Sequence, residues 1–297
     1  MPGRWRKTTM TENSIIRFGC EATAYSRKLE TLFASDLMRK PRPHDWLVRG
    51  FLEHDTLVLL FGDPAVGKSL LALDWAASVA TGRDWCGNRV ERGLVFYLAG
   101  EGHHGLSRRL KAWGIATGME CLWGEELWGM PLVVSRHSVG LPSETRMAIE
   151  AIDKAADRGG KPRLIIIDTL ARCIDGNENS ASDMGGFITA CDEMRLRYGC
   201  AVLILHHSGH ENKNRARAHS SLTCAVDAAY HMHGLNSGIR RLDCTKAKDF
   251  EPPAARHFII HKTLLPPEWW DGNAPTTVPV LVECDESGKA INEPPPF

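Results

Sequence analysis

Residues 57–69 read LVLLFGDPAVGKS. The first five form a continuous apolar run, which is typical of a strand covered on both faces. From Gly62 to Ser69 the chain fits the pattern G-x-x-x-x-G-K-[ST], whose spacing turns successive backbone N–H groups into a phosphate-sized cavity. Apolar helix formers follow as far as Ala80 and predict a buried helix whose positive N-terminal end faces that cavity. This stretch therefore predicts a phosphate-binding loop for a nucleoside triphosphate.

The loop assigns a role to each of its polar residues. Lys68 is expected to reach the β- and γ-phosphates, and the Ser69 hydroxyl is expected to ligate Mg²⁺. The alternative is a chance glycine-rich turn, but a strand before the loop and a helix after it are the context that a phosphate loop requires. We expect ATP to contact Gly62, Asp63, Pro64, Ala65, Val66, Gly67, Lys68, Ser69 and Leu70.

Apolar strands and helices alternate along the rest of the core. Strands are predicted at 94–99, 164–167 and 201–205, and helices at about 106–113, 144–158 and 180–198. This alternation predicts an α/β fold with a mainly parallel sheet flanked by helices. Three short strands between 228 and 261 predict a C-terminal antiparallel extension. The expected domains are a lead-in (1–45), an ATPase core (46–264) and a Pro-rich tail (265–297).

Composition excludes some classes of protein. Lys plus Arg equals Asp plus Glu at 36 each, so only a local basic patch could attract a nucleic acid. The nine cysteines form no C-x-x-C pair, which indicates reduced thiols rather than a zinc or redox motif. The apolar runs are strand-sized and no secretory signal is seen, so we expect a cytoplasmic protein with no membrane contact.

Two carboxylates follow predicted strands. Asp168 ends the Ile-rich strand, where a Walker-B carboxylate holds magnesium through water, although it could also be a helix N-cap. Glu101 follows the second strand between Gly100 and Gly102. It could orient the attacking water or be a solvated loop residue, and its position alone leaves both readings open.

Histidines and cations supply the remaining candidates. His206 and His207 end the fourth strand, where a neutral imidazole could sense the γ-phosphate; the alternative is one buried and one exposed histidine. Lys246 and Lys248 could reach the γ-phosphate of a neighbouring subunit or be surface lysines. A basic loop after His207 could bind single-stranded DNA phosphates or be merely solvated; its cations are Lys213, Arg215 and Arg217.

The order of these motifs resembles the RecA-like P-loop ATPases of plasmids and phages, specifically the RepA-like hexameric replicative helicases. The similarity runs from about Trp46 to about Pro253. The matching segments are DWLV (45–48), the phosphate loop (62–69), GLVFYLAGEG (93–102), IDTLAR (167–172), NENS (177–180) with Asp183-Met184, and HHSG (206–209).

The resemblance implies a RecA-like core, a catalytic role for Glu101 and a γ-phosphate sensor at His206 or His207. It also makes Lys246 and Lys248 candidate trans-acting residues in a ring whose channel loops, here residues 208–220, grip single-stranded DNA. Two features depart from the family. Arg217-Ala218-His219-Ser220-Ser221 replaces an Arg-Gly-Ser-Ser segment, and Lys248 replaces the usual arginine finger.

The sequence favours an oligomeric Mg-ATP-dependent DNA motor that forms a hexameric ring, as in a replicative helicase of a phage, plasmid or mobile element. The lysine pair also suits a recombinase-like or loader ATPase that assembles on DNA without unwinding it. The zero net charge and the altered loop suit a nucleotide-dependent regulatory module with little turnover.

Overall fold

The computed structural model describes residues 31, 33–39, 43–100, 103–119, 130–209 and 220–291. The chain divides into two compact units, Met1–Pro43 and His44–Phe297. The described part of the first unit contains helix α1 (Ala34–Arg39). All other elements belong to the second unit. No helix of the described ranges is long and apolar enough to cross a bilayer.

A nine-stranded sheet forms the centre of the second unit, in the order β11-β10-β9-β8-β3-β7-β6-β4-β5. Five parallel pairings join β8, β3, β7, β6, β4 and β5, and antiparallel pairings join β8 through β11. The predicted fold class is therefore confirmed. The strands are β3 (Leu57–Gly62), β4 (Leu94–Ala99), β5 (Leu132–Val134), β6 (Pro162–Asp168), β7 (Ala201–His207), β8 (Ala228–Gly234), β9 (Arg240–Ala247), β10 (Arg256–Leu264) and β11 (Thr277–Cys284). A separate hairpin pairs β1 (Trp46–Val48) with β2 (Leu52–Glu53).

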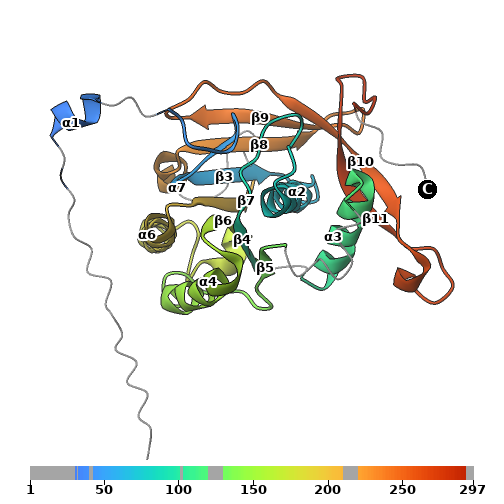
Figure 1. The fold of residues 1–297 in the computed structure, drawn as a ribbon, viewed down its shortest axis with the longest axis horizontal. Coiled ribbons are helices and arrows are strands. Elements are labelled where there is room, and N and C mark those ends of the chain that lie inside the picture. The colour runs from blue at the N-terminus through green and yellow to red at the C-terminus, as the bar shows by residue number, and fades with distance from the viewer. Residues whose placement is uncertain are drawn as a thin grey trace, which may run out of the picture. The chain divides into compact units, whose positions relative to one another are not determined.

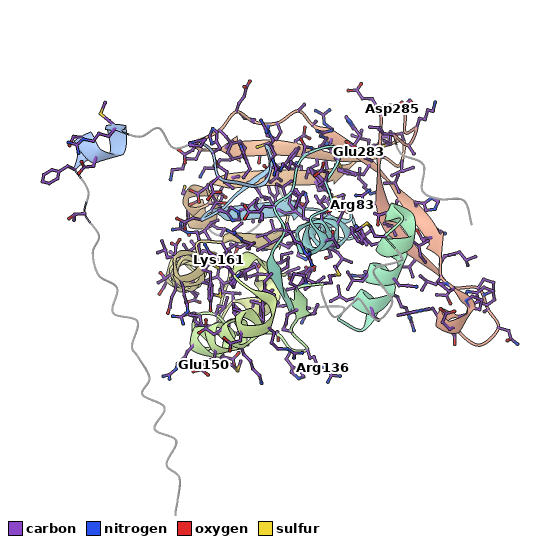
Figure 2. All side chains as sticks on the ribbon, viewed as in Figure 1. Arg83, Arg136, Glu150, Lys161, Glu283 and Asp285 are labelled. Carbon is purple, nitrogen blue, oxygen red and sulfur yellow. The ribbon has the colours of Figure 1, made fainter. Side chains whose placement is uncertain are left out.

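Helices cover both faces of this sheet, with α2 and α3 on one side and α4 and α6 on the other (Figure 1). The central strands β3, β4, β6, β7 and β8 contribute side chains to the cores on both faces, because successive side chains point to opposite faces. Thus Leu60 and Leu203 pack in the α2 core, whereas Leu59 and Ile204 pack in the α4/α6 core. Exposed charged residues such as Arg136 and Glu150 lie at the outside (Figure 2). The helices are α2 (Lys68–Thr81), α3 (His103–Thr117), α4 (Thr145–Gly159), α5 (Leu170–Cys173), α6 (Ala181–Tyr198), α7 (Ser220–Ala225) and the 3₁₀ turn η3 (Pro267–Trp269).

β5 and β11 are strands of the large sheet that the sequence did not predict. β5 has only three residues, too few to give an alternating pattern. β11 lies inside the segment expected to be a Pro-rich tail, and it pairs with β10 along eight residues. Pro279 is compatible with β11 because that strand is at the sheet edge, where a missing N–H is tolerated. The domain boundaries stay a prediction.

Asp74 on α2 is a partly buried carboxylate that the sequence did not single out. Its Oδ2 accepts a hydrogen bond from Trp85 Nε1 and its Oδ1 accepts one from Trp113 Nε1, both at 2.7 Å. Burial raises the pKa of Asp74, while the two indole donors act in the opposite direction. Asp74 thus joins α2 to α3 and to the turn before β4, and it satisfies two buried donors at once.

Replacing Asp74 with alanine is expected to lower the free energy of unfolding by about 2–5 kcal/mol, since each buried donor left unpaired costs about 1–3 kcal/mol. Guanidinium unfolding followed by tryptophan fluorescence measures this loss. Asp84→Ala is the control, because that carboxylate is exposed in the nearby turn. Equal stability of the two variants would contradict the role given to Asp74.

Candidate nucleotide-binding site

The parallel strands bring four predicted segments to one edge of the sheet, which here means the side at which these strands have their carboxyl ends. Gly62 at the end of β3 pairs with His207 at the end of β7. Ala99 at the end of β4 pairs with Asp168 at the end of β6. The carboxyl ends of parallel strands are where open α/β sheets bind their ligands. The phosphate loop and the Walker-B candidate therefore share one edge.

The phosphate loop is shaped by its glycines. Gly67 has φ 112°, a left-handed conformation that L side chains rarely adopt, and it begins α2 by accepting from Leu70 N and Leu71 N. At Gly62, an added Cβ would collide with the carbonyl oxygen of Met232 on the neighbouring β8. The motif's first and last glycines are thus each required, one by packing and one by backbone conformation.

Lys68 is buried with its ammonium inside the loop. Its Nζ donates to the carbonyl oxygens of Gly62 and Asp63, both at 3.0 Å, and lies 3.4 Å from His207 Nδ1. A phosphate oxygen carries a full negative charge and is a stronger acceptor than a carbonyl oxygen. The ammonium is therefore placed to exchange carbonyl partners for a phosphate when a nucleotide enters.

Asp168 is 4% exposed, and its Oδ2 accepts a hydrogen bond of 2.6 Å from the Tyr97 hydroxyl. Burial, together with the Asp168 charge, raises the pKa of Tyr97 well above its ordinary value, so the phenol stays a donor. Gly100 N donates to the Asp168 carbonyl oxygen at 2.7 Å. The sequence did not predict a role for Tyr97 at this site, because its position in a buried apolar strand indicated packing alone.

The residues at this edge fit the Mg-ATP that the motif implies. The Ser69 hydroxyl and the Asp168 carboxylate supply the oxygen donors that Mg²⁺ prefers. Lys68 supplies the compensating positive charge, and the glycines keep the loop free of side chains that would fill the phosphate cavity. Pro64 and Ala65, at the tip of the loop, are exposed. Which of these residues touch the nucleotide stays a prediction.

The two histidines point to opposite faces of the sheet. Ile204 packs with the α4/α6 core and Leu205 with the α2 core, so His206 follows the first face and His207 the second. His206 is fully buried, whereas His207 is partly exposed beside Lys68. Only the His207 ring therefore lies on the phosphate-loop side. The sequence could not make this distinction because it depends on which face α2 covers.

A second polar link ties the phosphate loop to β7. Ser208 Oγ donates a hydrogen bond to Asp63 Oδ1, and Ser208 N donates to the Gly62 carbonyl oxygen at 3.0 Å. A displacement of the end of β7 would therefore also displace the phosphate loop. The serine of the HHSG segment was part of the matching motif, but its contact with Asp63 was not foreseen.

Lys246 and Lys248 lie on the opposite side of the sheet, where the parallel strands have their amino ends. β9 runs antiparallel to β8, and Lys246 pairs with Ala229 near the amino end of β8. Lys246 Nζ donates to three carbonyl oxygens at the end of α7, those of Thr223, Cys224 and Val226, at 2.6–3.0 Å. This contact caps a helix C-terminus. Lys248 is 62% exposed and lies 3.4 Å from Asp227 Oδ1.

Some of the predicted residues lie outside the described ranges. They are Glu101 and the basic-loop residues Lys213, Arg215 and Arg217.

A cavity of about 730 Å³ opens at the amino ends of β4 and β6, between Gly93, Lys161 and Arg163 among others. That cavity is at the sheet edge opposite Gly62 and is not part of the phosphate loop.

Comparison with known proteins agrees with this geometry. A family model described as an AAA domain matches residues 23–213. One solved structure, described as an ATPase domain, is 14% identical with a TM-score of 0.52, covering 69% of this chain and 81% of that one. A KaiC-like protein from the hyperthermophilic archaeon Pyrococcus horikoshii is 12% identical with a TM-score of 0.51, covering 78% and 94%. At these identities the two structures show the fold, and the expectation of a RecA-like core is confirmed.

Proposed function

Because the chain belongs to the AAA domain family and is a P-loop ATPase of RecA-like fold, we propose that it is a Mg-ATP-driven motor acting on DNA. The observation that supports this most directly is the position of the Lys68 ammonium between the loop carbonyls and His207 Nδ1. The proposed action on DNA rests on the resemblance of the motifs to the RepA-like helicases. Its alternatives are a loader ATPase and a regulatory module.

Each residue of the site has a proposed task in hydrolysis. Lys68 offsets the charge of the β- and γ-phosphates, and the loop N–H groups orient them. Ser69 and Asp168 hold Mg²⁺, which when bound neutralises charge on the phosphate oxygens. Tyr97 positions the Asp168 carboxylate by its hydrogen bond. Glu101 remains the proposed residue that orients the attacking water.

His207 is the proposed γ-phosphate sensor. Its ring lies beside Lys68, and the next residue, Ser208, is bonded to Asp63 in the loop. Loss of the γ-phosphate would remove the partner that Lys68 and His207 share. The end of β7 would then transmit that loss to the segment that follows Gly209, the proposed DNA-binding loop.

His207→Gln is expected to lower the DNA-stimulated ATPase rate about tenfold, because one hydrogen bond to charge in a transition state is worth about 1.5–3 kcal/mol. Steady-state phosphate release with and without single-stranded DNA measures the effect. His257→Gln on β10 is the control, since β10 pairs with β9 and β11 and not with β3 or β7, which carry the loop and His207. Equal rates for the two variants would remove His207 from the sensor role.

We also propose that the motor is a homo-oligomeric ring in which Lys248 completes the site of a neighbouring subunit. Within one chain Lys248 lies at the sheet edge opposite Gly62, so its own phosphate loop is not its partner. Lys246 is the weaker trans-acting candidate because its ammonium is bonded to two carbonyl oxygens of α7 and to that of Val226, just after it. Lys248→Ala should then reduce ATPase in the assembled protein only.

The test of the proposed function is ATPase activity of the purified chain with and without single-stranded DNA at low salt, where phosphate contacts are strongest. Lys68→Ala serves as the blank. DNA stimulation together with DNA binding is the expected result. ATP turnover without any DNA effect would overturn the DNA part and leave the ATPase. Displacement of a paired strand separates an unwinding motor from a loader.

A further inference from the structure

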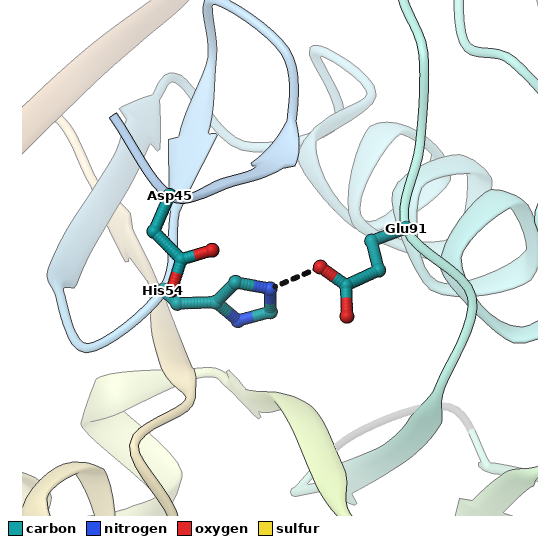
Figure 3. Close-up of side chains that lie close together, drawn as sticks. All are labelled: Asp45, His54 and Glu91. Atoms are coloured by element: carbon teal, nitrogen blue, oxygen red, sulfur yellow. Dashed lines mark hydrogen bonds and ion pairs between the residues drawn. The ribbon is translucent and has the colours of Figure 1, made fainter. Parts of the chain in front are cut away.

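Asp45, His54 and Glu91 converge at the sheet edge opposite the phosphate loop. Asp45 precedes β1, His54 precedes β3 and Glu91 precedes β4. Each offers one metal-binding atom, and these atoms all lie within 4.8 Å of one another. In Figure 3 the two carboxylates flank the His54 ring from different segments of the chain. The proposed ATPase chemistry uses none of the three.

Backbone hydrogen bonds fix these three residues independently of their side chains. His54 N donates to the Asp45 carbonyl oxygen at 2.8 Å. Glu91 N donates to the Leu47 carbonyl oxygen at 2.9 Å, and a β-bridge joins Val48 to Val90. The segment before β4 is thereby held against the β1–β2 hairpin. The three side chains meet on a preorganised frame, as a binding site requires.

The side-chain geometry suits a small cation. His54 Nε2 lies 3.1 Å from Glu91 Oε2. Metal–ligand bonds of about 2.0–2.1 Å at tetrahedral angles place two donor atoms about 3.4 Å apart. Arg163 Nη2 lies 2.6 Å from Glu91 Oε1, so it orients the carboxylate and leaves Oε2 toward the imidazole. Such contacts to the outer oxygen are typical around metal-binding carboxylates.

A simple His–Glu hydrogen bond leaves part of this arrangement unexplained. The His54 side chain is 3% exposed, so its Nε2 faces Glu91 away from bulk water. A single carboxylate suffices for the Nε2 hydrogen bond, yet Asp45 brings a second negative group within reach. Asp45 is exposed, so its side chain can rotate toward an ion at little cost. A divalent cation would offset both carboxylates.

We propose that Asp45, His54 and Glu91 bind a divalent transition-metal ion of the Zn²⁺ type. One imidazole nitrogen and two carboxylate oxygens are a donor set that suits Zn²⁺ better than Mg²⁺ or Ca²⁺, which prefer oxygen alone. A water molecule would take the remaining position. The ion would fasten the β1–β2 hairpin to the segment that leads into β4.

The experiment is a titration of the metal-stripped full chain with Co²⁺ and then Zn²⁺, without nucleotide or Mg²⁺. Cobalt bound by nitrogen and oxygen shows weak visible bands without the near-ultraviolet thiolate band that binding to cysteines would give. One equivalent with that spectrum, displaced by Zn²⁺, is expected. Failure to bind, or a thiolate spectrum alone, would overturn the proposal.

Asp45→Asn is the decisive variant because its exposed side chain can change without loss of the fold. It should weaken metal affinity at least about tenfold, since even the residues behind metal ligands are worth about 10- to 100-fold. Zn²⁺ should also raise the melting temperature of the unaltered chain more than that of the variant. Asp84→Asn is the matched control and should bind like the unaltered chain. Equal affinity of Asp45→Asn would contradict the site.

Discussion

Replacing Lys68 with alanine is expected to lower the ATP hydrolysis rate at least about 100-fold, with the fold retained. The ammonium is the cation inside the loop, bonded to the Gly62 and Asp63 carbonyl oxygens. In the proposed reacting complex it would face the charge that spreads over the γ-phosphate oxygens. Loss of one such preorganised group typically costs about 10²–10³ in turnover. The two carbonyl oxygens remain next to a partly open loop, where water can replace the lysine.

Phosphate release and nucleotide affinity should be measured separately for this variant. Lys154→Ala is the matched control because that lysine is exposed on α4, away from the phosphate loop. Urea unfolding checks that Lys68→Ala keeps its stability. A rate within a few-fold of the unaltered chain would contradict the nucleotide site itself and with it the proposed motor.

Local patterns were sufficient to predict the parallel core. The strand before the phosphate loop, the loop and α2 follow each other directly, so spacing and residue type carry the information. The strands ending at Asp168 and His207 are buried apolar runs followed by polar residues. Because the carboxyl ends of parallel strands meet on one side of a sheet, the sequence alone predicts that their last residues lie together.

What the sequence left undetermined depends on contacts between distant segments. The choice between His206 and His207 follows from the face that α2 covers, which no single strand encodes. Tyr97 reads as a core residue until its hydroxyl is seen against Asp168, one strand away. In the sequence Lys246 reads as a free cation. In the structure α7, a helix that the sequence did not predict, and Val226 just after it supply three carbonyl oxygens to its ammonium.

Replacing Asp168 with asparagine is expected to lower the magnesium-dependent ATPase rate at least about 100-fold. The substitution is nearly isosteric, and the amide oxygen can still accept from the Tyr97 hydroxyl, so packing at the end of β6 is preserved. What changes is the negative charge that we propose holds Mg²⁺ through water. The loss should therefore appear in the dependence on magnesium concentration rather than in stability.

Tyr97→Phe separates the effect of the Asp168 charge from the effect of the position of the Asp168 carboxylate. It keeps the Asp168 charge but removes a hydrogen bond of 2.6 Å, so we expect a smaller fall in rate, about three- to tenfold. Tyr230→Phe is its control, since that hydroxyl makes an equally short bond to the Phe51 carbonyl oxygen away from the nucleotide site. It should lose comparable stability and keep its ATPase rate. If Asp168→Asn hydrolysed ATP normally at saturating magnesium, Asp168 would have only a structural role at the end of β6. Another carboxylate would then have to hold the metal.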